Sequence, residues 1–208
     1  MSIGPLFRLW CILLSSTLIG VAICIYWLDV PVALVFVGNI GLAADLGRGL
    51  GSALLVTAQT AVISIIAIVR LTKGKLPPFA KDVFVACCAS LSAFAANDYG
   101  LKYLFGRLDP SDYFQNTPER VFHLFQGTQD SSFPSGHMVM AAAFAIAMIR
   151  LQPRTSPFLI ILLCLGAAAL IVGDWHFLSD VIAGAFIGGS AGLVAGELWA
   201  EHEYRAKN

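Results

Sequence analysis

Long apolar runs are the feature that most restricts how this chain can fold. Several of them approach the ~20 residues that a helix needs to cross the hydrocarbon core of a bilayer. The 208 residues are 58% hydrophobic and only 12% charged, whereas soluble domains carry about 25% charged residues. The mean hydropathy is +0.78. These values exclude an ordinary soluble domain and predict an all-α, polytopic membrane protein.

Six apolar segments are expected to span the membrane as helices, within one integral membrane domain that covers residues 1–208. Their approximate bounds are 6–28, 51–71, 82–105, 135–149, 158–172 and 176–199. Residues 30–50 are interrupted by glycines and by polar side chains, which predicts an interfacial or re-entrant segment. Residues 107–133 form the longest polar stretch, and the aromatic residues within it predict an ordered active-site loop at the outer face.

Positive charge in short loops favours the cytoplasmic side of a membrane. With six spans, most basic residues fall on one side: Arg8, Lys73, Lys75, Lys81, Arg150, Arg154, Arg205 and Lys207. Both termini are therefore expected in the cytoplasm, with the loop 107–133 and the region of His176 facing outward. The formal net charge of zero gives no indication of nucleic-acid binding. The five cysteines lie inside apolar runs without metal-ligand spacing, and we interpret them as buried hydrophobes.

Two polar features stand out where apolar runs begin. The stretch Pro134–His137 reads Pro-Ser-Gly-His and opens the fourth expected span. A helix start presents unpaired amides and the positive end of the helix dipole, which favour an anion, and His137 adds a titratable group there. Downstream, His176 and Asp180 are four residues apart, which places them on one face of a helix. A carboxylate in that position can orient an imidazole and favour its charged form.

A third feature lies at the end of the third expected span. Asp98 and Lys102 are one helical turn apart, and Arg107 follows. Two cations at a helix end can clamp the oxygens of a phosphate. The alternative is an Asp98–Lys102 ion pair whose side chains extend to the interface. All three features map to the same expected membrane face.

These residue types favour phosphoryl transfer without a metal or other cofactor. An oriented imidazole can attack phosphorus, and a second imidazole can protonate the leaving oxygen. Cations and backbone amides can hold the remaining phosphate oxygens. The sequence offers no Asp/Glu/His cluster of the kind that a two-metal phosphatase uses.

The three features together resemble the membrane-bound type 2 phosphatidic acid phosphatases and their bacterial lipid-phosphatase relatives. That family has the motifs Lys-x6-Arg-Pro, Pro-Ser-Gly-His and Ser-Arg-x5-His-x3-Asp. The middle motif is complete at Pro134–His137, and the second half of the third is His176–Asp180. The first begins with Lys102 and ends with Pro110 at the expected spacing. The resemblance covers the third to sixth expected spans.

The resemblance implies a role for each matching residue. His176 would be the nucleophile that forms a phosphohistidine, Asp180 would orient it, and His137 would be the acid toward the leaving group. The residues implied to bind phosphate are Lys102, Ser135 and Gly136.

Two positions depart from the family pattern. Asp109 stands where the first motif has its arginine, and Ala169-Leu170 stand where the third has Ser-Arg. Losing one charged contact to a transition state costs roughly 10²–10³ in rate. Asp109 is alternatively expected to contact a hydroxyl or amine of the substrate. The cations that could replace the missing arginines are Arg107, Arg120 and Arg48.

The resemblance implies a lipid phosphatase in the bacterial inner membrane, acting at the outer face on a lipid phosphate or diphosphate. A lipid phosphotransferase that uses an acceptor other than water is one alternative. A catalytically impaired lipid-binding or transport protein on the same fold is another, which the missing arginines favour and the intact His137, His176 and Asp180 oppose. The expected partners are the bilayer and the lipid substrate. The sequence predicts neither the head group nor the oligomeric state.

Overall fold

Helices make up the fold. The computed structural model describes residues 3–37, 41–116 and 121–207, where it contains helices and one isolated β-bridge between Arg107 and Phe122. The α-helices are α1 (Ile3–Ile23), α2 (Asp29–Phe36), α3 (Gly41–Lys73), α4 (Pro78–Ala96), α5 (Lys102–Phe105), α6 (Pro110–Asn116), α7 (Gly136–Leu151), α8 (Ser156–Val172) and α9 (Leu178–Arg205). Five-residue π-helical segments, Cys24–Leu28 and Asn97–Leu101, join α1 to α2 and α4 to α5.

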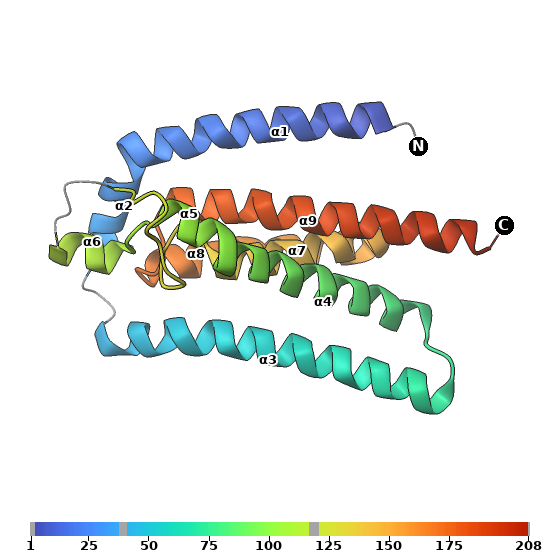
Figure 1. Ribbon diagram of the computed structural model, residues 1–208. Helices are drawn as coiled ribbons and strands as arrows, with labels where there is room; N and C mark the ends of the chain where they lie inside the picture. Colours follow the sequence, from blue (N-terminus) through green and yellow to red (C-terminus); the bar gives the residue numbers. More distant parts are fainter. Residues whose placement is uncertain (1–2, 38–40, 117–120, 208) are drawn as a thin grey trace.

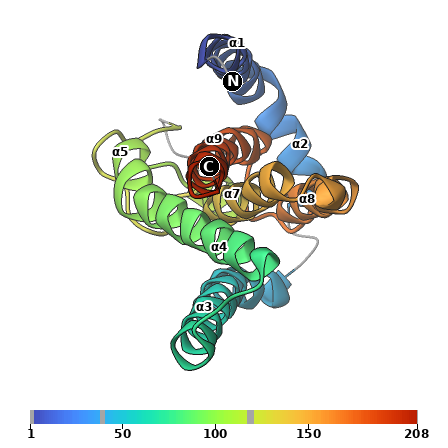
Figure 2. The same ribbon diagram turned by 90° about the vertical axis from the view of Figure 1, so that its right-hand side faces the viewer.

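The long helices form an elongated bundle with distinct ends. Both termini lie at one end, and α2, α6 and the loop before α7 lie at the other (Figure 1). Seen along the bundle, α7 and α9 occupy the centre, with α1 and α3 on opposite sides (Figure 2). Helix α7 packs against α9, α4 and α8, and α9 also packs against α1. The centre of the bundle is therefore the α7–α9 pair.

The structure confirms an all-α polytopic membrane fold. Five segments are long and apolar enough to cross a membrane: Phe7–Phe36, Leu50–Lys73, Pro78–Phe105, Pro153–Val172 and Leu178–Arg205. The remaining expected span corresponds to α7, which has only 16 residues. At 1.5 Å per residue α7 is about 24 Å long, shorter than the ~30 Å hydrocarbon core. Because α7 is enclosed by α4, α8 and α9, it does not depend on lipid contact along its whole length.

The described residues between 30 and 50, where the sequence predicted an interfacial or re-entrant segment, belong mostly to helices. Helix α2 covers 29–36, and α3 begins at Gly41, ten residues before the expected start at 51. The glycines there lower helix propensity but do not break a helix as an internal proline does. Arg120 and the side chain of Arg48, two of the expected cations, lie outside the described part of the structure.

A row of glycines determines how closely α7 and α9 approach. A Cβ atom added to Gly188 would lie 2.1 Å from the carbonyl oxygen of Val139, and one added to Gly192 would lie 2.2 Å from that of Ala143. Small residues at every fourth position let two helix backbones pack in direct contact. The row is Gly184, Gly188, Gly192 and Gly196. This contact brings the first turns of α7 and α9 together at the end of the bundle away from the termini.

Candidate active site

Two imidazoles face each other where α7 and α9 begin. His137 lies in the first turn of α7, and His176 lies two residues before α9. Their ring centroids are 6.0 Å apart. The ring of His137 packs against that of Trp175, at a centroid distance of 5.5 Å, while His176 is buried. The structure thus brings together two histidines that are far apart in the sequence.

A serine hydroxyl lies between His176 and Asp180. The Nδ1 atom of His176 is 3.8 Å from the nearest Asp180 oxygen, which is too long for a hydrogen bond. The Ser132 hydroxyl donates to Asp180 Oδ2, and its oxygen lies 3.2 Å from His176 Nδ1. This network assigns the proton to Nδ1, which donates to Ser132 and leaves the lone pair on Nε2. The prediction that His176 and Asp180 lie on one face of a helix is wrong in one respect, because His176 precedes the first residue of α9.

Both oxygens of the Asp180 carboxylate are engaged. Oδ2 accepts a second hydrogen bond, from the amide of Phe177 at 2.9 Å, which caps the start of α9. Oδ1 accepts from Arg107 Nη1 at 2.6 Å. Asp180 is fully buried, and a buried carboxylate is costly unless it is paired and hydrogen-bonded. These contacts hold the carboxylate in one orientation behind His176.

Arg107 is buried behind the histidine pair. Its Nη2 donates to Asp29 Oδ2 at 2.7 Å, and its Nη1 also donates to Ser179 Oγ at 2.6 Å. The guanidinium lies over the Phe177 ring, 4.1 Å from the centroid, which adds a cation–π contact. This position differs from that expected of a phosphate ligand, because both Nη atoms face acceptors within the protein.

The start of α7 is formed by Ser135 and Gly136, both buried. The Ser135 hydroxyl caps the helix by accepting from the amide of Met138 at 3.4 Å. A Cβ atom on Gly136 would lie 3.1 Å from an Asp98 oxygen and 3.1 Å from the Phe94 ring. A larger residue at position 136 would therefore need Asp98 or Phe94 to shift by a few tenths of an ångström.

Lys102 lies near the start of α7, where it forms an ion pair with Asp98. Its Nζ is 2.9 Å from Asp98 Oδ1 and donates to the carbonyl oxygen of Gln129 at 2.7 Å. The ion pair that the helical spacing offered as an alternative is present. Because Asp98 also lies against Gly136, the ion pair is next to the helix start at which phosphate binding was expected.

The two positions that depart from the family pattern have structural contacts. Asp109 Oδ1 accepts from Ser111 Oγ at 2.8 Å and from the amide of Asp112 at 2.9 Å, which caps α6. Leu170 is buried in an apolar cluster with Met138. Neither residue supplies the positive charge of the family's arginines.

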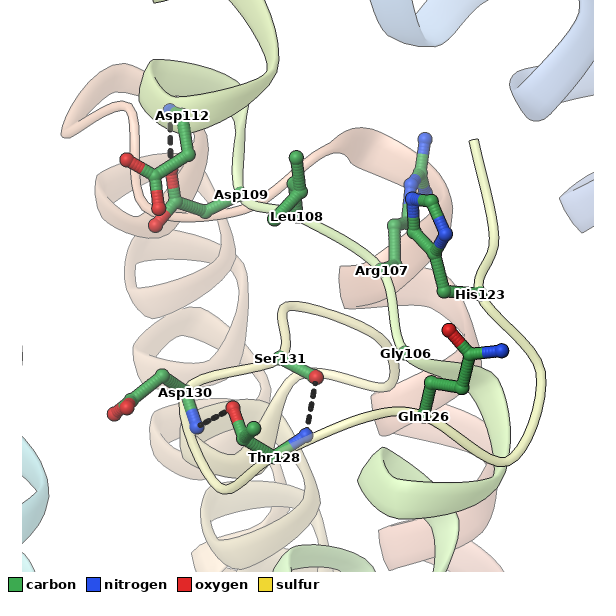
Figure 3. A pocket seen from close by; sticks show the side chains of 10 residues that line it. All are labelled: Gly106, Arg107, Leu108, Asp109, Asp112, His123, Gln126, Thr128, Asp130 and Ser131. Carbon is green, nitrogen blue, oxygen red and sulfur yellow. Dashed lines mark hydrogen bonds between the residues drawn. The ribbon is translucent and has the colours of Figure 1, made fainter. Parts of the chain in front are cut away.

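A polar cavity of about 260 Å³ lies beside Arg107. Figure 3 shows Asp109 and Asp112 on one wall and Thr128, Asp130 and Ser131 on another. The other lining residues are Gly106, Arg107, Leu108, His123 and Gln126. Within the described part of the chain, no three His, Cys, Asp or Glu side chains are grouped as metal ligands, here or elsewhere.

Two residues of this network were not predicted from the sequence. Asp29 ends the first apolar run, and an ionisable residue near a membrane span is a functional candidate by default, so that signal was present. Ser132 carries no comparable signal, because nothing in the sequence separates it from Ser131 beside it.

The fold and the site define a helical integral membrane protein with paired histidines at one end of its bundle. A family profile described as the PAP2 superfamily matches residues 79–202, more than half of the chain, and the chain belongs to this family. The matched part contains Lys102, both histidines and Asp180, whereas Asp29 lies outside it.

One curated relative is similar over part of the chain. Over 102 residues the chain is 37% identical to a protein of Rhizobium etli named Lipid A 1-phosphatase. The match covers 48% of this chain and 43% of the relative, so it spans less than half of the relative's length. No solved structure matches the chain.

Proposed function

We propose that this protein is a metal-independent lipid phosphatase that hydrolyses a lipid phosphate or diphosphate through a phosphohistidine. The observation that carries the proposal is the alignment of Asp180, Ser132 and His176, which leaves Nε2 of His176 available beside His137. Membership of the PAP2 superfamily and similarity to a lipid A 1-phosphatase support a lipid phosphate as the substrate class.

In the first step, Nε2 of His176 forms a bond to phosphorus while the bond from phosphorus to the lipid oxygen breaks. His137, in its protonated form, gives its proton to that leaving oxygen. In the second step, His137 takes a proton from a water molecule as the water oxygen bonds to phosphorus. The P–N bond then breaks, phosphate leaves and His176 returns to its starting state.

The phosphate oxygens would be held at the start of α7. The helix dipole and the amide of Gly136 favour an anion there, and Lys102 supplies a positive charge. The Ser135 amide already donates to the carbonyl oxygen of Asp180. Asp98 neutralises Lys102 in the structure, so a bound phosphate would share or displace that carboxylate. A direct contact from Arg107 to phosphate would require its guanidinium to leave Asp29 or Asp180.

The site would face the outside of the bacterial inner membrane. The histidine pair lies at the end of the bundle opposite both termini, as Figure 1 shows for the starts of α7 and α9. The α3–α4 connection carries Lys73 and Lys75 and lies at the same end as the termini. Because positive loops favour the cytoplasm, this arrangement supports cytoplasmic termini and an outward-facing site.

A lipid phosphotransferase is the second candidate, and the polar cavity beside Arg107 favours it (Figure 3). Acidic and hydroxyl side chains in that cavity could hold the hydroxyl or amine of an acceptor, as the sequence suggested for Asp109. The two candidates differ in one observable. A transferase releases little phosphate in water alone and gains turnover when an acceptor lipid is added.

Phosphate release by the purified protein in detergent tests the proposal. The panel contains phosphatidic acid, phosphatidylglycerol phosphate, a polyprenyl diphosphate and lipid A, each assayed with EDTA present. We expect release that survives EDTA and falls by at least about 10³-fold in His176→Ala, because the nucleophile is lost. Release that requires a metal, or that persists in His176→Ala, would contradict the proposal. Lipid binding without any turnover would support the lipid-binding alternative instead.

A further inference from the structure

We infer that Asp29 of α2 is a positioning residue for the nucleophile. This inference rests on the proposed function. The Asp29 carboxylate holds Arg107 and the first turn of α9. Arg107 and this turn hold Asp180, which contacts His176 through the Ser132 hydroxyl. Asp29 does not touch the space between the two imidazoles, so its effect passes through these neighbours.

Asp29 is held by several hydrogen bonds inside the protein. The residue is buried, and each carboxylate oxygen has a defined donor. Oδ2 accepts from Arg107 Nη2 at 2.7 Å and from the Ser179 hydroxyl at 2.5 Å. Oδ1 accepts from the Ser179 amide at 2.9 Å. A charge buried this deeply persists only when it is paired and hydrogen-bonded, and all of these partners belong to the site end of the bundle.

The guanidinium of Arg107 connects two carboxylates. Nη2 is bonded to Asp29 and Nη1 to Asp180, each within 2.7 Å. Because the guanidinium is a planar fork, fixing one of its nitrogens fixes the direction of the other. Without the charge on Asp29, Arg107 would keep only one of its two carboxylate contacts. Asp180 would then be held by a guanidinium whose other contacts include the Ser179 hydroxyl and the Phe177 ring.

Asp29 also fixes the end of the helix that carries Asp180. The Ser179 amide lies in the first turn of α9 and has no partner within that helix. Asp29 supplies its acceptor from a different part of the chain, 150 residues away in sequence. The Ser179 hydroxyl completes the connection, since it donates to Asp29 and accepts from Arg107.

Part of the site then comes from a segment outside the family match. Residues 79–202 contain the histidines, Asp180 and Arg107, but Asp29 belongs to the apolar segment Phe7–Phe36. That segment is therefore more than a membrane anchor: its last helix supplies a buried counter-ion to the site.

Kinetics of Asp29→Asn test the inference, with Asp82→Asn as the matched control. Asp82 also accepts two side-chain hydrogen bonds, from Gln152 and Trp199, but at the end of the bundle near the termini. We expect Asp29→Asn to lower kcat by about 10- to 100-fold, the range seen when a group that orients a metal-ligating side chain is removed. KM should change by less than about two-fold, because substrate contacts are kept. Asp82→Asn should retain the kcat of the unmodified protein.

A spectroscopic signal of His176 provides a readout that does not depend on turnover. The proton on Nδ1, hydrogen-bonded to Ser132, should give a ¹H–¹⁵N signal in the detergent-solubilised protein that disappears in His176→Ala. We expect Asp29→Asn to shift or broaden this signal and Asp82→Asn to leave it in place. If the unmodified protein released no phosphate from any lipid, the proposed function would fail, and this signal alone would decide whether Asp29 positions His176.

The inference is wrong if folded Asp29→Asn keeps its kcat within about two-fold, or if the His176 signal does not move. Should Asp29→Asn fail to fold, Ser179→Ala takes its place. That variant removes only the hydroxyl between Asp29 and Arg107, and we expect it to lower kcat by about ten-fold. An unchanged kcat in folded Ser179→Ala would overturn the inference.

Discussion

At the scale of single residues, the Ser132 hydroxyl is the link between His176 and the Asp180 carboxylate. Asp180 is too far from His176 for a direct hydrogen bond, and the hydroxyl contacts both groups. A hydroxyl can donate to one group and accept from another, so it transmits the orientation of a carboxylate to an imidazole. The serine therefore orients the imidazole together with the carboxylate.

The variant Ser132→Ala tests that link. We expect kcat to fall by about 10- to 100-fold with little change in KM, because the imidazole loses its orienting partner but stays in place. Ser90→Ala is the matched control, since Ser90 is equally buried and its hydroxyl donates to the carbonyl oxygen of Met140 between α4 and α7. It should lose about 1 kcal/mol of stability and keep its turnover. Equal kcat values for the two variants would contradict the role of Ser132.

The variant Asp180→Asn should be more severe. An amide matches the carboxylate in shape, but its NH₂ group cannot accept from Ser132 or Arg107, and the negative charge opposite Arg107 is lost. We expect kcat to fall on the order of 10³- to 10⁴-fold, as when the carboxylate of a nucleophile–base pair is replaced. Phosphate release per folded molecule, with folding checked by the thermal transition, measures this. A loss below about ten-fold would mean that Asp180 does not orient the nucleophile.

The sequence predicted the two histidines, Asp180 and Lys102 as neighbours, because each lies where a polar segment meets an apolar run. It did not predict that Arg107 would be enclosed by Asp29 and Asp180. Asp29 and Arg107 are 78 residues apart and share no helical period, so only the three-dimensional packing brings them together. The position of Asp109 as the cap of α6 was also unforeseen, although an aspartate before Pro110 is a common helix start.

At the scale of helices, the glycine row on α9 determines the distance between the two halves of the site. The Ser135 amide donates to the carbonyl oxygen of Asp180 at 3.1 Å, which joins the first turns of α7 and α9 directly. Side chains larger than hydrogen along this row would separate the helices. His137 would then move away from His176, since each is carried by one of the two helix starts.

Replacing Gly188 by alanine tests this arrangement, and Gly189→Ala is the matched control. Both changes favour helix formation equally. At Gly188 the new methyl group meets the Val139 backbone at 2.1 Å, whereas at Gly189 its nearest contact is the Ile146 side chain at 3.6 Å. We expect Gly188→Ala to lose about 1–3 kcal/mol of stability and most of its turnover. Equal thermal stability of the two variants would contradict the close contact.

The hydropathy of the sequence predicted the long helices but not the π-helical segments that interrupt them. The apolar runs identify the spans because each backbone in lipid must satisfy its own hydrogen bonds, which a helix does. The π-helical segments at Cys24–Leu28 and Asn97–Leu101 leave no trace in hydropathy. Each of them immediately precedes a charged residue of the site end, Asp29 and Lys102, so both shift the helical register where the site is built.

At the scale of the whole molecule, the two ends of the bundle carry different sets of polar residues. The end that holds the termini is cross-linked by ion pairs between helices, Lys81–Glu203 and Arg150–Glu197. The other end carries the histidines and the polar loops. Because the histidines and the termini lie at opposite ends, the proposed orientation places the histidines outside when the termini are cytoplasmic.

Labelling of intact cells tests the orientation. A cysteine introduced at Gln126, exposed in the loop before α7, should react with a thiol reagent that cannot cross the inner membrane. A cysteine introduced at Lys207, exposed near the C-terminus, should react only after the membrane is permeabilised. The unsubstituted protein gives the background of its five cysteines. The reverse pattern would place the site in the cytoplasm.

The central claim is that His176 becomes phosphorylated during turnover. Rapid quenching of the protein with a ³²P-labelled lipid phosphate, in EDTA, measures this directly. The account predicts a label on the protein that is stable in base and labile in acid, that maps to His176, and that is absent from His176→Ala. Phosphate release without such a label, or a label on another residue, would contradict the account.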